Sequence, residues 1–329
     1  MSKGSLTGHI FISSLILFIF KWFFSYYFFD DDISVKIIFD TPSDGFFYYV
    51  YSNAIASFNF NFSYDVYENS LNNLPIPFYA ILLHSILLIL FQDYSILILE
   101  FIFIFLFVWI FSKIFEKLKF IPLFGIFFSI LYFSIPSIID LLNLNNIRYL
   151  NALSEISGLR FPRPLIVNFF FYYYLYYLLN INFENFFTYK NFILLAFLFS
   201  ITLSSFYYYF IIQIISLSIL LLINFKIKDI FNINKLKYYF TFFISFIFFS
   251  IPFIYFILTS ENDYLERMYV FDLSLENKIK LINYLLAKLF SLKVIIVILI
   301  SILINIYINR DKFTEYRKIN IFFIVLISS

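Results

Sequence analysis

Long apolar runs, separated by short polar clusters, dominate the chain. The runs have the lengths of helices, and the longer ones approach the ~20 residues that a helix needs to cross the hydrocarbon core of a bilayer. They cover residues 10–29, 76–91, 96–112, 120–139, 165–182, 191–224, 238–258 and 291–308, with a last run from near residue 319. The pattern predicts an all-α fold: a polytopic bundle of about nine transmembrane helices, with short surface helices in the outer loops.

Two of these runs do not match a single crossing. The run 76–91 is short and follows Pro75 and Pro77, so we expect it to lie along the outer surface. As one helix, the run 191–224 would be about 51 Å long at ~1.5 Å per residue, too long for a ~30 Å hydrocarbon core. We expect two short helices that meet at a turn near Ser204 and Ser205.

The composition supports a lipid environment. Hydrophobic residues make up 62% and charged residues 13% of the 329 residues, and the mean hydropathy is +0.89. Soluble domains carry about 25% charged residues. Cysteine is absent, which excludes disulfides, thiolate nucleophiles and cysteine-bound metals, and two histidines are too few to favour a histidine-based metal site. The first run lacks a small-residue cleavage site, so we expect a first transmembrane helix instead of a removed signal peptide.

The distribution of basic residues indicates an orientation. With 76–91 on the outer surface and 191–224 as a helix pair, slightly more Lys and Arg fall in the loops of one side, which the positive-inside rule assigns to the cytoplasm. The outer loops on this assignment are 30–95, 140–164 and 259–290. We expect one transmembrane domain over residues 1–329. Because the last run stops at Ser329, short of the ~20 residues of a span, we expect the natural protein to continue beyond it.

Carboxylates concentrate in the first outer loop, where residues 30–75 contain a single basic residue, Lys36. The acids of this segment are Asp30, Asp31, Asp32, Asp40, Asp44, Asp65 and Glu68. Asp44 follows Pro42 and precedes an aromatic run; a turn and then a short surface helix would place it near a helix N-terminus, which keeps a carboxylate ionised. There it could act as a general base or as a ligand of a divalent cation. The alternative is a structural N-cap or turn aspartate.

Two short motifs after the first helix resemble the GT-C superfamily, polytopic glycosyltransferases that use polyprenyl-phosphate sugars, of the aminoarabinose or mannosyl transferase type. The motifs are Asp44-Gly45-Phe46-Phe47-Tyr48-Tyr49 and Leu74-Pro75-Ile76-Pro77-Phe78-Tyr79-Ala80-Ile81-Leu82-Leu83-His84. The resemblance covers residues 1–140 as an order of elements. It implies that Asp44 is the catalytic base, with Tyr48 and His84 as candidate substrate contacts. The second acid of the family's pair is Gly45 here, which leaves dependence on a divalent cation (Mg²⁺ or Mn²⁺) open.

Arginines gather in the second outer loop, residues 140–164. Arg148, Arg160 and Arg163 lie there together with Glu155. The guanidinium fork suits phosphate, and the prolines around Arg163 favour an extended chain. One interpretation is a clamp on the donor's phosphate, with Glu155 as a second acid or metal ligand. The alternative is a set of interfacial anchors whose side chains reach toward water.

A few polar residues stand inside the apolar runs. Glu100 is a functional candidate as an acid at membrane depth, although its closeness to the helix start also allows an interfacial position. His84 either packs inside the protein or faces Asp44 across the loop. The triplets Tyr172-Tyr173-Tyr174 and Tyr207-Tyr208-Tyr209 are typical of the aromatic belts at membrane interfaces.

These features favour a membrane glycosyltransferase that moves a sugar from a polyprenyl-phosphate donor to an acceptor glycan, lipid or protein on the outer face, with inversion. Its partners would be that donor, the acceptor and membrane lipid, with no nucleic acid, and its place would be the bacterial inner membrane, as a multi-pass protein. One alternative is a flippase or transporter of lipid-linked sugars, which would carry charges within its helices; Glu100 and Lys21 are the main ones. A polysaccharide polymerase, which also uses outer-loop arginines, is the other.

Overall fold

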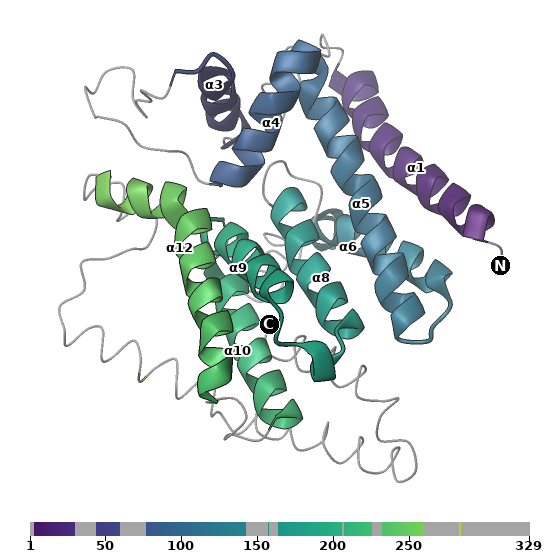
Figure 1. The fold of residues 1–329 in the computed structure, drawn as a ribbon. Helices are drawn as coiled ribbons and strands as arrows, with labels where there is room; N and C mark the ends of the chain where they lie inside the picture. Colours follow the sequence, from purple (N-terminus) through teal and green to yellow (C-terminus); the bar gives the residue numbers. More distant parts are fainter. Residues whose placement is uncertain are drawn as a thin grey trace.

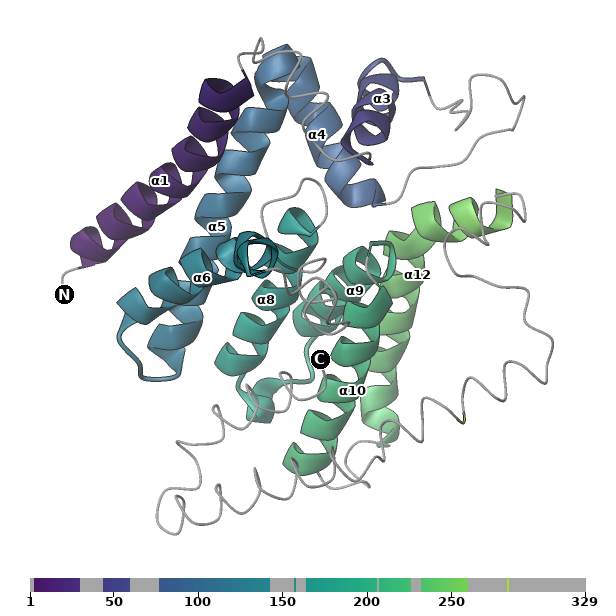
Figure 2. The same cartoon turned by 180° about the vertical axis from the view of Figure 1, so that it is seen from behind.

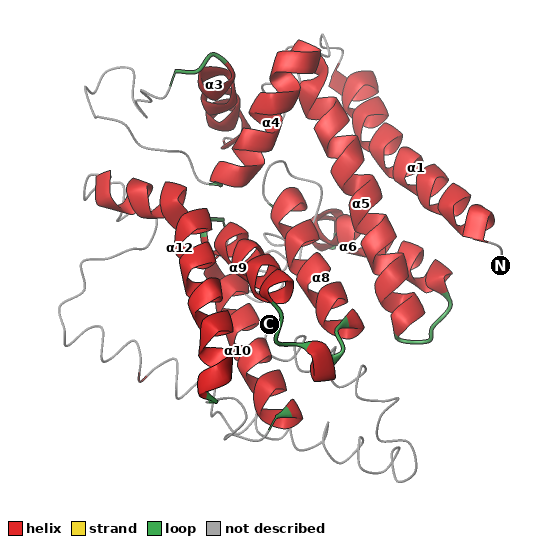
Figure 3. Ribbon diagram, viewed as in Figure 1, coloured by secondary structure: helices red, strands yellow, loops and turns green. Residues whose placement is uncertain are grey.

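The computed structural model describes residues 3–29, 44–59, 77–142, 157, 164–205, 207–225, 232–259 and 283. Within these residues every regular element is a helix, so the expected all-α fold is confirmed (Figures 1 and 3). The first half contains α1 (Lys3–Phe29), α3 (Asp44–Ala56), α4 (Phe78–Phe91), η1 (Gln92–Tyr94), α5 (Ser95–Lys117) and α6 (Pro122–Leu141). The second half contains α8 (Leu165–Asn180), η2 (Phe183–Asn185), α9 (Tyr189–Leu203), α10 (Tyr207–Asn224), η3 (Ile233–Lys235) and α12 (Leu236–Thr259).

Four stretches in the described residues are long and apolar enough to cross a membrane. They are Ser5–Trp22 of α1, Ser95–Lys117, Pro122–Ile139, and Ile233–Tyr255 across η3 and α12. The apolar helices α4 and α9 and the apolar part of α10 are shorter. The protein is therefore membrane-embedded, but about nine spans are not confirmed: several apolar runs form helices of less than a full span, and the runs 291–308 and 319–329 lie outside the described residues.

The run 191–224 forms two helices, as expected. Helix α9 ends at Leu203, Ser204 and Ser205 form the turn, and α10 begins at Tyr207. The amide of Ser204 donates to the carbonyl of Ser200 (3.0 Å), which satisfies one of the last carbonyls of α9. At its other end α9 is capped by Thr188, whose hydroxyl accepts from the amide of Asn191 (3.3 Å).

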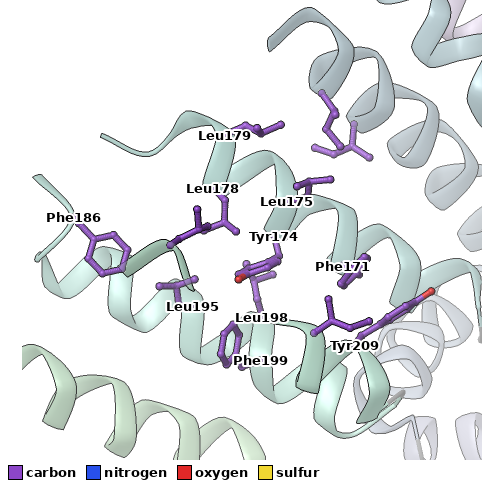
Figure 4. Packing of buried hydrophobic residues seen from close by; sticks show 14 of the residues in the cluster. Phe171, Tyr174, Leu175, Leu178, Leu179, Phe186, Leu195, Leu198, Phe199 and Tyr209 are labelled. Carbon is purple, nitrogen blue, oxygen red and sulfur yellow. The ribbon is translucent and has the colours of Figure 1, made fainter. Parts of the chain in front are cut away.

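The largest apolar core joins α5, α8, α9 and α10 (Figure 4). Tyr174 on α8 is fully buried and lies among Leu195, Leu198 and Phe199 of α9. A second core joins α1, α4, α5, α6 and α8, and a third joins α3 and α4. Seen from behind, α1, α5 and α6 form one group and α9, α10 and α12 another, with α8 between them (Figure 2). The bundle therefore has continuous apolar contacts from α1 to α10.

Gly125 brings α5 and α6 into close contact. A Cβ atom at this position would lie 2.5 Å from the Cα atom of Ser112 on α5, closer than real atoms approach. Small residues allow such close approach of membrane helices, which then associate by packing. The absence of a side chain at Gly125 is thus a packing requirement of the α5–α6 pair.

We expect Gly125→Ala to lower the free energy of unfolding by about 1–3 kcal/mol, because the added methyl must push two backbones apart. Gly8→Ala on α1 is the matched control, since a Cβ at Gly8 meets nothing within 4 Å. Equilibrium unfolding in mixed detergent micelles would measure both. Equal stability of the two variants would contradict the close approach.

The described lysines are distributed unevenly between the two ends of the bundle. One end, called here the lysine-rich end, carries the C-terminus of α5 and the starts of α9 and α12 (Figure 1). Its lysines are Lys113, Lys117, Lys119, Lys190, Lys235 and Lys237. The opposite end, called here the α3–α4 end, carries α3, α4, η1 and the first turns of α5 (Figure 1). The positive-inside rule predicts that the lysine-rich end faces the cytoplasm and the α3–α4 end faces outward.

Thiol labelling would test this orientation in a chain that has no cysteine of its own. Asn53 on α3 and Asn232 before η3 are both exposed and lie at opposite ends. In intact cells, a membrane-impermeant thiol reagent should modify Asn53→Cys and spare Asn232→Cys until the membrane is permeabilised. Labelling of both residues, or of Asn232→Cys alone, would overturn the orientation.

Candidate functional site at the α3–α4 end

Asp44 is the first residue of α3, which confirms the expected short helix after the turn. The first amides of a helix have no partner inside the helix, and they carry the positive end of its dipole. A carboxylate at this position is favoured in its ionised form. Helix α3 has 13 residues, too few to cross a bilayer, and it lies at the α3–α4 end.

Helix α3 is held on α4 by an apolar contact. Tyr48, Tyr51 and Ile55 of α3 pack with Ile81 of α4, and all four are buried. Tyr48 therefore lies on the face of α3 that turns toward α4. The sequence suggested Tyr48 as a substrate contact; in the structure its ring lies in this helix–helix contact and is 7% exposed.

His84 is a buried hydrogen-bonded junction of three helices. Its Nδ1 atom lies 2.7 Å from Oγ of Ser52 on α3, and its Nε2 atom lies 3.0 Å from Oγ of Ser95 at the start of α5. The Ser52 hydroxyl donates to the carbonyl of Tyr48 (2.9 Å), so it accepts the proton of Nδ1, and Nε2 accepts from Ser95. His84 thus ties α4 to both α3 and α5.

The surroundings of His84 keep it uncharged. Its side chain has no exposed surface, and burial lowers the pKa of His84 to about 4. Both ring nitrogens already have partners, so the imidazole is a packed residue, one of the two alternatives that the sequence left open. Its visible effect is to fix the register of α3, and with it the position of Asp44, against α4 and α5.

Tyr79 connects α4 to the second half of the chain. The Tyr79 hydroxyl donates to the carbonyl of Phe249 on α12, and its ring packs edge-on against Phe197 of α9 (5.9 Å between centroids). Phe197 in turn packs against Phe249 (5.2 Å). The non-spanning helices α3 and α4 are therefore supported by α5 on one side and by α9 and α12 on the other.

Glu100 forms an ion pair with Lys21 at the same end. The Lys21 ammonium lies 2.9 Å from both carboxylate oxygens, and it also lies 5.1 Å from the centroid of the Trp22 ring. The Glu100 side chain is 1% exposed and that of Lys21 is 31% exposed. The sequence singled out both residues but not their pairing. The signal was present, because each is the single charged residue of its apolar run, 10–29 and 96–112.

A buried polar network inside the bundle was not anticipated from the sequence. Asn168 on α8 donates to the hydroxyl of Tyr132 on α6 (2.8 Å) and accepts from the hydroxyl of Tyr209 on α10. The Tyr174 hydroxyl donates to the carbonyl of Gln213 (2.9 Å). Tyr174 and Tyr209 belong to the triplets expected at the membrane interface. That expectation is wrong for these two rings, which are buried because their hydroxyls find partners on neighbouring helices.

The second expected part of the site, Arg148, Glu155, Arg160 and Arg163, lies outside the described residues. Among the residues that are described, no group of three or more His, Asp or Glu side chains could hold a metal ion. The described site therefore consists of Asp44 on α3, the contact of α3 with α4, the His84 junction and the Lys21–Glu100 pair.

Comparison with protein-family models, with curated proteins and with solved structures gave no match. The resemblance to the GT-C superfamily thus depends on the motifs at residues 44–49 and 74–84 and on the order of elements around them.

Proposed function

We propose that the protein is a membrane glycosyltransferase of GT-C type, acting at the outer face of a bacterial inner membrane. It would transfer a sugar from a polyprenyl-phosphate donor to an acceptor glycan, lipid or protein. The observation that carries the proposal is the place of Asp44: it starts a short, firmly packed helix at the α3–α4 end, opposite the lysine-rich end. An acid held at the membrane surface can meet both a lipid-linked donor and a water-borne acceptor.

The proposed chemistry is a direct displacement at the anomeric carbon. Asp44 would accept the proton of the acceptor hydroxyl or amine as that group attacks, and the polyprenyl phosphate would leave from the opposite face. One displacement inverts the anomeric configuration. The phosphate would leave with its negative charge, which Arg160 and Arg163 of the second outer loop would stabilise.

The support for a base at position 44 comes from the way in which α3 is held in place. A catalytic group must be held within a fraction of an ångström of its working geometry. Helix α3 is fixed by four buried apolar side chains and by the hydrogen bond between Ser52 and His84 (2.7 Å). This is more support than a solvated surface helix needs, and it favours a functional role over a simple turn aspartate.

A transporter of lipid-linked sugars has less support. Such a protein needs charged groups that face a path through the bundle. In the described spans, the charged residues away from the lysine-rich end are Lys21 and Glu100, and they contact each other (2.9 Å). A closed pair of this kind stabilises helix contacts more readily than it binds a passing substrate.

The proposal is tested by sugar transfer in membranes that contain the protein. Membranes are incubated with polyprenyl-phosphate sugars that carry a radiolabel, and label is measured in lipid, glycan and protein fractions. Transfer that requires the protein and is lost in Asp44→Asn is the expected result. Transport of labelled lipid across the membrane with no transfer would overturn the proposal in favour of the transporter.

A further inference from the structure

Two lysines at the lysine-rich end lie over aromatic rings. The Lys235 ammonium lies 4.0 Å from the centroid of the Phe187 ring and 5.0 Å from that of Phe225. The Lys237 ammonium lies 5.1 Å from the Tyr238 ring and 6.0 Å from the Tyr189 ring. A cation within ~6 Å of a ring face is attracted by the ring's quadrupole.

The four rings belong to one continuous cluster. Phe187 packs against Phe225 (5.2 Å between centroids) and Tyr238 (6.1 Å), and Tyr238 packs against Tyr189 (5.1 Å). They come from the segment before α9, the start of α9, the residue after α10 and the start of α12. We call this group, with its lysines, the lysine–aromatic rim: Phe187, Tyr189, Lys190, Phe225, Lys235, Lys237 and Tyr238.

Within the described part of the chain, Lys235 and Lys237 lie over aromatic rings and have no carboxylate partner. An aromatic face attracts an ammonium without cancelling its net charge, whereas Lys113 at the same end is 2.7 Å from the carboxylate of Glu116. The seven residues of the rim include three lysines, Lys190, Lys235 and Lys237. Lysines that lie over aromatic side chains are typical of a protein surface at the level of the lipid headgroups.

We propose that the lysine–aromatic rim binds the headgroup of an anionic phospholipid. The ammonium groups of Lys190, Lys235 and Lys237 would donate to the lipid phosphate. The acyl chains would follow α12, whose exposed apolar side chains begin directly at the rim with Leu236 (63% exposed) and Phe240 (64% exposed). The adjoining apolar face of α12 favours a lipid over a free phosphate, because the acyl chains of a lipid can pack against it. This site is at the end opposite Asp44 and is independent of the proposed function.

Lipid titration of the purified, detergent-solubilised full chain tests the proposal. Native mass spectrometry would count bound lipid on the wild type, on Lys235→Gln/Lys237→Gln, and on the control Lys113→Gln/Lys117→Gln, which also removes two lysines from the lysine-rich end. The probes are phosphatidylglycerol, phosphatidylcholine and inorganic phosphate. A melting curve of each variant without lipid would verify that it is folded.

We expect the wild type and the control to bind phosphatidylglycerol in preference to phosphatidylcholine. The affinity of the rim variant for phosphatidylglycerol should fall by about 30-fold, as for two lysines at an anionic surface. An equal loss of affinity in the control would show that general surface charge binds the lipid, and the rim would not be a specific site. Equal binding of the two lipids, or no loss in the rim variant, would overturn it as well. If millimolar inorganic phosphate displaces the lipid, the ligand of the rim is a soluble anion and the lipid proposal is wrong.

Discussion

Replacing Asp44 by Asn should lower the rate of sugar transfer by about 10²–10⁴-fold, the usual contribution of a general base. Asn has nearly the size of Asp and is also well suited to a helix start, so α3 should still form and pack on α4. The amide cannot accept the acceptor's proton, so the loss should fall on kcat with little change in KM for the donor. Initial rates at several donor concentrations measure both quantities.

The control for this variant is Asp93→Asn, which removes an acid from η1 at the same end of the bundle and should leave the rate close to that of the wild type. Asp44→Glu keeps a carboxylate one methylene further from the backbone and should retain part of the activity. If Asp44→Asn and Asp93→Asn transfer sugar equally well, Asp44 is a structural helix-start residue, and the proposed mechanism is wrong.

The helices could be predicted because each depends on a local pattern. Apolar runs at 76–91 and 96–112 became α4 and α5. The length of the run 191–224 predicted two helices, since one helix would have exceeded the bilayer, and the serine pair Ser204-Ser205 indicated the turn. Helix ends were less predictable. Helix α1 begins at Lys3, seven residues before its apolar run, because backbone hydrogen bonds continue the helix through polar residues that the hydropathy pattern leaves out.

The candidate site could be predicted only in part, because its contacts join distant segments. The position of Asp44 at a helix start depends on neighbouring residues alone, so the sequence could predict it. The partners of His84 were not predictable, because serines such as Ser52 and Ser95 carry no signal of their own and become partners only when α3, α4 and α5 pack together. The same applies to Asn168 and Tyr209, which are 41 residues apart.

The Lys21–Glu100 pair could be predicted in part, unlike the partners of His84. A lone lysine and a lone acid in separate apolar runs each need a partner, because an isolated charge at membrane depth is costly. The choice of partner is still a tertiary matter, since 79 residues separate the two and α1 must first lie along α5. A lone charge in each of two runs is thus a usable sequence signal for a contact between helices.

Breaking this pair from the lysine side should have the largest effect on stability of any single substitution at the α3–α4 end. Lys21→Met leaves the Glu100 carboxylate buried, 1% exposed, without its cation. Loss of one partner of a buried pair costs about 3–5 kcal/mol, and we expect the lower part of that range because Lys21 is partly exposed. The free energy of unfolding in mixed detergent micelles measures this loss.

The reverse substitution should be milder. In Glu100→Gln the buried group is neutral, and the remaining lysine can extend its ammonium toward the headgroups. The double variant Lys21→Met/Glu100→Met should recover most of the stability, since replacing both charges by apolar side chains is often neutral. As a control, Lys113→Met breaks the exposed pair with Glu116 and should cost less than about 1 kcal/mol. If the effects of Lys21→Met and Glu100→Met simply add in the double variant, the two side chains do not interact, and α1 is held on α5 by apolar packing alone.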